Sequence, residues 1–242
     1  MNHPKPLPAD AFRVPVISVT QETSSIKSFL LDVSQVPFSY TAGQWIDLYV
    51  EIDGRYEVGG YSLTSSPLTE GRVQLAIKAA RDHHVTRYMH EEAQPGSEVF
   101  ISNGQGGFCF ERGMSDALVL LGAGIGVTPL ISILRYVAQA AREVDTTLVY
   151  SVSSPDEILF RDELDNLRHT HPNIRCVYTV TQPHSSWAGN MRRIDQRMLE
   201  ELELPREALY YYCGSRSFIE DMTVELRDMG VAESHLRYEK WW

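Results

Sequence analysis

A glycine-rich turn at 122–129 (GAGIGVTP) is the clearest candidate for binding chemistry in this sequence. It follows a continuous apolar run at 118–121, which is typical of a strand buried on both faces, and it precedes a helical pattern. Thr128 suits the cap of that helix and Pro129 its first position. The glycines let the backbone approach a ligand closely, so the turn would point free N–H groups at a phosphate. A tight connection that binds nothing fits the same residues.

A second candidate lies where a tyrosine-rich run at 209–213 ends in Cys213 and Gly214. The glycine-rich turn alone is a weak signal, because Val127 takes the third glycine position of the strict G-x-G-x-x-G pattern. Two candidates in one parallel sheet are more specific, since ligands bind at the carboxyl ends of such strands. Taken alone, a cysteine here fits a small buried apolar residue.

The elements around these candidates divide the chain into two parts. Up to about residue 110 the sequence shows short stretches of alternating apolar residues separated by turn residues, which predict an antiparallel barrel or sandwich. The predicted strands are 12–19, 26–33, 44–52, 73–79 and 99–102. One stretch without alternation, 85–93, predicts a helix.

The second part alternates strand and helix patterns, which indicates a parallel sheet covered by helices. The predicted strands are 118–121, 147–152, 174–180 and 209–213. The predicted helices are 129–143, 160–168, 197–203 and 218–229. The sequence therefore predicts a β-barrel domain over 1–112 followed by an α/β domain over 113–242.

Composition excludes several classes of protein. The chain has 22 Lys and Arg against 32 Asp and Glu, a formal charge of −10, which argues against nucleic acid or an anionic membrane as the main partner. Its three cysteines, Cys109, Cys176 and Cys213, are too few and too scattered for a disulfide scaffold, a cysteine-rich zinc site or a four-cysteine iron–sulfur cluster. No secretory signal or membrane span is visible, so we expect a soluble cytoplasmic protein.

Four motifs in a fixed order resemble a known family. They are the segments 60–67 (GYSLTSSP), 122–129 (GAGIGVTP), 213–215 (CGS) and 239–242 (EKWW). Together they resemble the ferredoxin–NADP reductase superfamily of flavoprotein oxidoreductases, and most of all its oxidoreductase NAD-binding-domain-containing protein 1 branch. The resemblance covers residues 12–242. It implies an N-terminal antiparallel Greek-key barrel that binds FAD and a C-terminal Rossmann-like domain that binds NAD(P).

The resemblance implies a set of flavin-binding residues in the barrel. The ring of Tyr61 would lie against the flavin, and the hydroxyl of Ser62 would reach its N5 atom. Thr86 would bind the pyrophosphate; a simple helix cap is the alternative role for it. The full set is Gly60, Tyr61, Ser62, Leu63, Ala76, Ile77, Lys78, Val85 and Thr86.

One position departs from the family pattern, because Gly59 stands where an arginine usually pairs with the flavin phosphate. A lost charge-assisted hydrogen bond would weaken flavin binding by about 1.5–3 kcal/mol. Arg55, Lys78 and Arg87 are the candidates to supply the missing charge.

On the nicotinamide side, the resemblance assigns the turn to the pyrophosphate and Cys213 with Gly214 to the nicotinamide. The implied contacts are Gly122, Gly124, Gly126, Val127, Thr128, Pro129, Ser153, Gln182, Cys213 and Gly214. Ser62, Cys213 and Glu239 would be the catalytic residues, with Glu239 as a carboxylate near the flavin N5. Trp241 or Trp242 would cover the flavin ring where the nicotinamide must later lie.

The implied function is an FAD-dependent oxidoreductase that passes a hydride between NAD(P)H and FAD. NADH is favoured, because acidic residues follow the strand 147–152 and Thr181–Gln182 follows the next, with no base to hold a 2′-phosphate unless Arg192 or Arg193 folds back. Electrons would leave to a separate acceptor, a ferredoxin, flavodoxin, quinone or small molecule, because the chain lacks cluster cysteines. A non-catalytic nucleotide-binding or sensor module is the alternative, motivated by Gly59.

Overall fold

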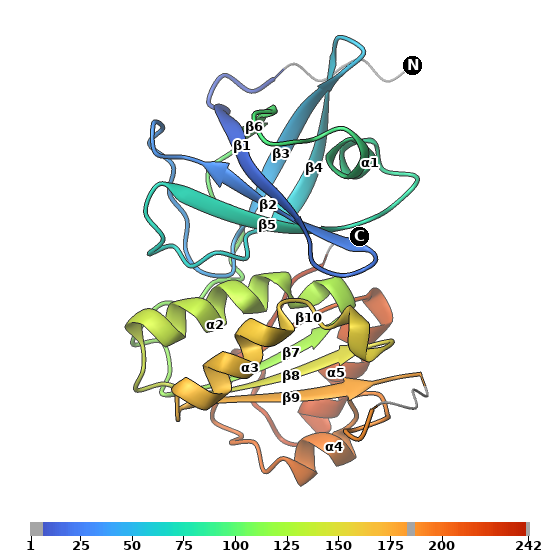
Figure 1. The fold of residues 1–242 in the computed structure, drawn as a ribbon. Helices are drawn as coiled ribbons and strands as arrows, with labels where there is room; N and C mark the ends of the chain where they lie inside the picture. Colours follow the sequence, from blue (N-terminus) through green and yellow to red (C-terminus); the bar gives the residue numbers. More distant parts are fainter. Residues whose placement is uncertain (1–6, 183–186, 241–242) are drawn as a thin grey trace.

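The computed structural model describes residues 7–182 and 187–240, and it places a β-barrel above an α/β domain (Figure 1). The barrel sheet has the strand order β4-β3-β6-β1-β2-β5, with antiparallel neighbours throughout. An isolated bridge between Leu63 and Leu75 joins the chain just after β4 to the other edge strand, β5. The elements are β1 (Phe12–Gln21), β2 (Ile26–Asp32), β3 (Trp45–Ile52), β4 (Arg55–Ser62), β5 (Arg72–Lys78), α1 (His84–Glu91) and β6 (Glu98–Ile101).

Strand β4 was missing from the predicted elements, because its sequence RYEVGGYS has no apolar alternation. It forms nevertheless, since a two-residue turn at Asp53 and Gly54 connects it to β3. Both turn residues have positive φ, 52° and 72°, as the tight turns that match strand twist require. The resulting register places Ser62 directly opposite Trp45. This hairpin therefore fixes where the Tyr61–Ser62 pair lies.

The α/β domain contains a parallel sheet in the order β11-β10-β7-β8-β9. Alternate residues of β7 serve two cores: Leu118 and Leu120 pack with α2 residues, whereas Val119 and Leu121 pack with α4 and α5 residues. Helices thus cover both faces of the sheet, as predicted. The elements are β7 (Ala117–Ala123), α2 (Thr128–Ala140), β8 (Asp145–Val152), α3 (Arg161–Thr170), β9 (Ile174–Val180), α4 (Gln196–Glu201), β10 (Leu209–Cys213), α5 (Arg216–Asp228) and the unpredicted β11 (Leu236–Tyr238), with short 3₁₀ turns η1 (Gly124–Val127), η2 (Pro155–Glu157) and η3 (Glu233–His235).

The sheet reverses its winding direction between β7 and β10. From β7 the chain proceeds to β8 and β9 on one side, and it then returns to add β10 on the other side of β7. Cys213 pairs with Gly122 in the register of these two strands, so the glycine-rich turn and Gly214 start from the same edge. Ligands of open parallel sheets bind at such a reversal point.

One local prediction was wrong: Thr128 does not cap helix α2. It is the first helical residue, and its hydroxyl donates to the carbonyl oxygen of Ile125 at 2.9 Å. The reason is that Gly124–Val127 already forms a 3₁₀ turn continuous with the helix, so the helical backbone begins before Thr128. Pro129 lies in the first turn, where its missing N–H costs no hydrogen bond.

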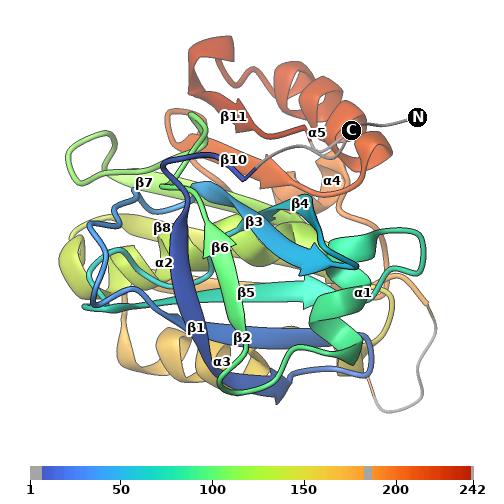
Figure 2. The same cartoon turned by 90° about the horizontal axis from the view of Figure 1, so that it is seen from above.

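The two domains are joined by hydrogen bonds from α2 to the barrel. The buried hydroxyl of Ser132 donates to the carbonyl oxygen of Ser65 at 2.6 Å. Arg135 donates to the carbonyl oxygen of Thr64 at 2.8 Å and pairs with Glu163 of α3. Seen from above, α2 lies beneath the barrel strands (Figure 2). These contacts fix the distance between the barrel wall and the glycine-rich turn.

None of the helices in the described part of the chain is long and apolar enough to cross a membrane. The same residues contain no group of three or more His, Cys, Asp or Glu side chains placed to bind a metal ion.

Candidate active site between the two domains

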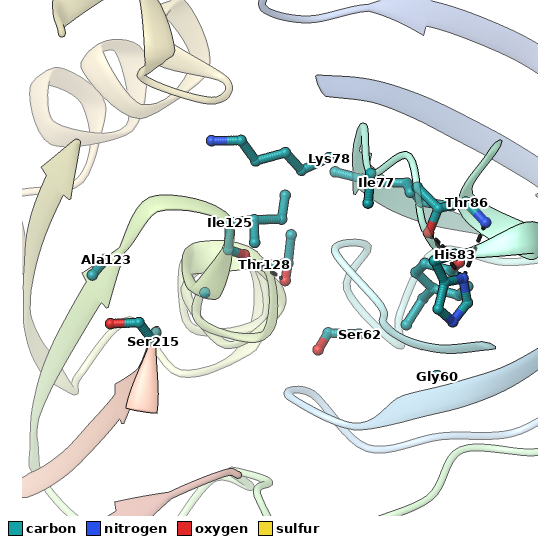
Figure 3. A pocket seen from close by; sticks show the side chains of 15 residues that line it. Gly60, Ser62, Ile77, Lys78, His83, Thr86, Ala123, Ile125, Thr128 and Ser215 are labelled. Carbon is teal, nitrogen blue, oxygen red and sulfur yellow. Dashed lines mark hydrogen bonds between the residues drawn. The ribbon is translucent and has the colours of Figure 1, made fainter. Parts of the chain in front are cut away.

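A cavity of about 620 Å³ lies between the barrel and the α/β domain (Figure 3). Its barrel side is formed by Gly60, Tyr61, Ser62, Ala76, Ile77, Lys78, Ala80, His83 and Thr86. Its α/β side is formed by Ala123, Ile125, Gly126, Thr128, Gly214 and Ser215. Ten of these fifteen residues were predicted to bind one of the two cofactors. The cavity volume is in the usual range for small-molecule sites.

A hydrogen-bonded group of side chains forms the barrel wall. The Tyr61 hydroxyl and the Thr86 hydroxyl lie 2.9 Å apart, and His83 Nδ1 accepts from the Thr86 backbone N–H at 3.3 Å. His83 is therefore the N-cap of α1, and the alternative role of Thr86 as the cap was wrong. Burial raises the pKa of Tyr61 to about 12, so its phenol stays neutral at physiological pH.

Ser62 is well placed for chemistry. Ser62 is buried, with 7% of its surface exposed, and that exposed part lines the cavity. Its hydroxyl forms no hydrogen bond with another residue in the described part of the chain. A hydroxyl in this position can donate to a bound ligand without giving up a protein partner.

Lys78 also belongs to the barrel side of the cavity, and its ammonium pairs with a carboxylate of the α/β domain. Its Nζ is 3.4 Å from the Glu157 carboxylate, which also accepts from the hydroxyls of Ser24 and Ser25. Figure 3 shows the Lys78 side chain extending toward the α/β side and away from His83. Of the three predicted substitutes for the missing arginine, Arg55 and Arg87 are not among the lining residues.

The glycine-rich turn meets β10 through backbone contact. A Cβ at Gly126 would lie 2.5 Å from the Cys213 carbonyl oxygen and 2.6 Å from the Gly214 Cα. Only glycine fits there, because both neighbours are main-chain atoms that cannot rotate away. Gly124 has a φ of +55°, which turns the chain from β7 into α2. The two predicted segments are thus in direct contact.

Several predicted cofactor-binding residues support the site from behind. Leu63 and Val85 are buried in the barrel core, and Val127 and Cys213 are buried in the α/β core. Pro129 of α2 and Gly122 of β7 are buried as well, and neither of them lines the main cavity. Cys213 is fully buried, so Gly214 and the neighbouring backbone form the cavity surface at that point.

A second cavity of about 290 Å³ continues on the other side of the turn. Its lining includes Gly124, Ser153, Thr181, Arg193 and Asp221. Ser153 was predicted to bind the dinucleotide; Gln182 only donates its backbone N–H to the Ser153 carbonyl at 3.1 Å. Arg193 lines this second cavity, so it does fold back toward the predicted dinucleotide site. Glu157, one of the acidic residues used to favour NADH, instead accepts hydrogen bonds from Ser24 and Ser25 of the barrel.

Some of the lining residues that the motifs missed are sequence neighbours of predicted ones. Ala123, Ile125 and Ser215 belong to the glycine-rich and Cys-Gly segments, so a contiguous reading of those motifs finds them. His83 and Asp221 carry no such signal, because their sequence neighbours do not mark them as ligands.

Glu239 lies beside Gly106 of the barrel domain. A Cβ added at Gly106 would lie 3.1 Å from Glu239 Oε1 and 2.7 Å from the Trp45 indole nitrogen, so both side chains are close to this glycine. Trp45 is the strand partner of Ser62, so the carboxylate approaches the same part of the barrel. Burial raises the pKa of Glu239 to about 7. Trp241 and Trp242 lie outside the described residues.

Replacing Glu239 by glutamine should flatten the pH dependence of stability. Because the pKa is raised from the ordinary 4.5 to about 7, the folded state holds a proton that the unfolded state has lost between these values. The wild type should lose stability as pH rises through this window, whereas Glu239→Gln should not lose that part. We expect the Tm of the variant, relative to the wild type, to increase from pH 5 to pH 8. A Tm difference that is the same at every pH would contradict the assignment.

Comparison with known proteins agrees with this architecture. The family model of the oxidoreductase FAD-binding domain matches residues 13–110, and that of the oxidoreductase NAD-binding domain matches residues 120–223. The chain is 32% identical to the oxidoreductase NAD-binding domain-containing protein 1 of Danio rerio, with 96% of this chain and 93% of that protein covered.

Two solved structures have the same fold. The FAD/NAD-binding domain of a nitric oxide dioxygenase from Vibrio cholerae has a TM-score of 0.85 and 23% identity, covering 95% of this chain and 98% of that one. A ferredoxin NADP⁺ reductase from Neisseria gonorrhoeae, solved with FAD and NADP, has a TM-score of 0.83 and 21% identity, covering 97% and 100%. With an FAD-binding oxidoreductase domain, an NAD-binding oxidoreductase domain and a relative matched over almost its whole length, the chain belongs to the oxidoreductase NAD-binding domain-containing protein 1 family.

Proposed function

We propose that this protein is an FAD-dependent oxidoreductase that takes a hydride from NAD(P)H, with NADH favoured, and passes the electrons to a separate acceptor. One observation carries the proposal: a single cavity is lined both by the residues predicted to bind the flavin and by those predicted to bind the dinucleotide. Hydride transfer needs two rings in contact, and a cavity shared by two nucleotide-binding domains provides for that.

The lining residues suit a flavin. Tyr61 offers an aromatic ring, Ser62 a hydroxyl on the cavity surface, and Thr86 a hydroxyl at the start of α1. Bound there, FAD would supply a two-electron acceptor that can release electrons singly. The protein would bind and orient both cofactors, with Ser62 as a hydrogen-bond donor at N5 and Glu239 as a nearby proton carrier.

The polar lining of the second cavity suits NADH. Arg193 reaches this cavity and could contact a 2′-phosphate, but Asp221 lies in the same lining and would repel one, and the other polar lining residues, Ser153 and Thr181 among them, are neutral hydroxyls. A 2′-phosphate would bring about two negative charges into a lining that is neutral in total. The ribose 2′-hydroxyl of NADH needs only hydrogen bonds, which Ser153 and Thr181 can provide.

The second candidate function is a nucleotide-binding or sensor module without turnover, and Gly59 is the observation that favours it. Absorption spectroscopy separates the two. We expect the purified protein, after incubation with FAD, to retain a flavin spectrum. Anaerobic mixing with NADH should bleach it at least about tenfold faster than mixing with NADPH, as a lost charge-assisted bond would give.

The outcomes are distinct. Protein that gains no flavin from FAD would refute the enzyme proposal and favour the binding module. Flavin that binds but is bleached by neither nucleotide would favour a sensor, and equal bleaching rates would refute only the NADH preference. Turnover with a ferredoxin, a flavodoxin, a quinone or a small-molecule dye would then identify the class of acceptor.

A further inference from the structure

His83 is an unassigned polar side chain on the wall of the main cavity. Its imidazole lies edge-on to the Tyr61 ring, with centroids 6.3 Å apart and an interplanar angle of 83°. The Thr86 backbone N–H donates to its Nδ1, so in the neutral ring the proton belongs to Nε2. The neutral His83 ring therefore has a free N–H donor at Nε2 while Nδ1 holds the start of α1.

Gly59 is what makes room for this imidazole. A Cβ at position 59 would lie 2.7 Å from His83 Cε1 and 2.8 Å from Tyr61 Cε2, so any larger residue would displace one of the two rings. The position that departs from the family pattern and the histidine on the cavity wall are thus one packing arrangement. The space that an arginine side chain would need is taken by His83.

The other candidate cations are less well placed. Lys78 is paired with Glu157 across the domain interface, and neither Arg55 nor Arg87 lines the cavity. Of the lining residues in the described part of the chain, Lys78 and His83 are the two with side-chain nitrogen donors, and Lys78 is already paired.

We propose that His83 binds the phosphates of the flavin through Nε2, and that it takes over the role left open by Gly59. The inference rests on the proposed function, because it needs FAD in this cavity. A hydrogen bond from Nε2–H to a charged phosphate oxygen is stronger than one between neutral groups, so its loss selectively weakens the binding of flavins that carry phosphates.

The charged groups nearest His83 face a smaller cavity that His83 also lines. Glu57 of β4, Asp82 and His84 of α1 line that cavity, and Glu57 lies 3.6 Å from His84 there. In the main cavity, Lys78 of β5 is paired with Glu157.

The test compares FAD with riboflavin, which lacks the phosphates. Dissociation constants are measured from flavin fluorescence for the wild type and His83→Asn. Asparagine is a good N-cap, so this variant keeps the start of α1 while it removes the imidazole. We expect His83→Asn to bind FAD about tenfold more weakly than the wild type and to bind riboflavin with unchanged affinity.

His84→Asn is the matched control. It removes the neighbouring imidazole, which pairs with Glu57 at the smaller cavity, and it should leave the affinities for FAD and for riboflavin unchanged.

The proposal is overturned if His83→Asn binds FAD as tightly as the wild type, or if it weakens FAD and riboflavin equally, since a merely structural role would act on both. A wild type that binds neither flavin would overturn the proposed function together with this inference. Flavin binding without a selective effect of His83 would overturn the inference alone.

Discussion

Alanine at Gly126 is expected to abolish efficient flavin reduction by NADH. The added Cβ would lie 2.5 Å from the Cys213 carbonyl oxygen and 2.6 Å from the Gly214 Cα, and neither main-chain atom can move aside alone. The start of α2 must then separate from the end of β10, which moves both predicted nicotinamide segments. A misplacement of about 1 Å can cost a hundredfold in rate. Stopped-flow bleaching of the FAD-loaded protein over a range of NADH concentrations measures the loss.

The matched control is Gly107→Ala. Gly107 has no atom within 4 Å of its Cβ position, so alanine there should leave the reduction rate unchanged. FAD binding to the Gly126→Ala protein should remain within a few-fold of the wild type, because its flavin residues lie mainly on the barrel. If Gly126→Ala reduced its flavin at the wild-type rate, the turn would not hold the dinucleotide.

Removal of the Ser62 hydroxyl is expected to give the second large effect. Ser62→Ala should reduce the rate of flavin reduction by NADH about a hundredfold, as loss of one donor at a site of developing charge does. FAD affinity should change much less, because the hydroxyl contributes chiefly when charge appears at N5. Single-turnover rates and FAD dissociation constants, measured on the same preparations, separate the two effects.

Ser66→Ala is the control, since Ser66 is buried in the same segment but does not line the cavity. Its hydroxyl accepts from the Leu68 backbone N–H, so any loss there should appear as lower Tm and not as a lower rate. Equal rates for Ser62→Ala and the wild type would remove Ser62 from the catalytic residues.

Predictions succeeded where the signal was local. The run 118–121 is apolar on both faces, and the glycines after it permit one kind of turn, so β7 and the turn were found from a few adjacent residues. Strand β4 was missed because Gly59 and Gly60 interrupt its alternation, and only pairing with β3 shows that it is a strand. The wrong cap at Thr128 has a similar cause, because the preceding 3₁₀ turn cannot be read from the cap residue itself.

Charged side chains were the hardest to place. Lys78 was a candidate for the flavin phosphate, but its partner Glu157 lies 79 residues away in the other domain. Arg193 is 40 residues from Ser153, yet both line the second cavity. Long side chains choose partners by the geometry of the folded chain, and spacing in the sequence does not encode that choice.

By itself, the sequence determined the order of the two domains and the two segments, Tyr61–Ser62 and the glycine-rich turn, that would carry the chemistry. Apolar periodicity and glycine content express the domain order and the turn locally, whereas Tyr61–Ser62 was identified through the resemblance to a known family. Only the tertiary structure decided that both segments face one cavity, that His83 fills the space above Gly59, and that Gly126 lies against Cys213. These contacts join residues far apart in the chain, so they depend on strand order and domain packing.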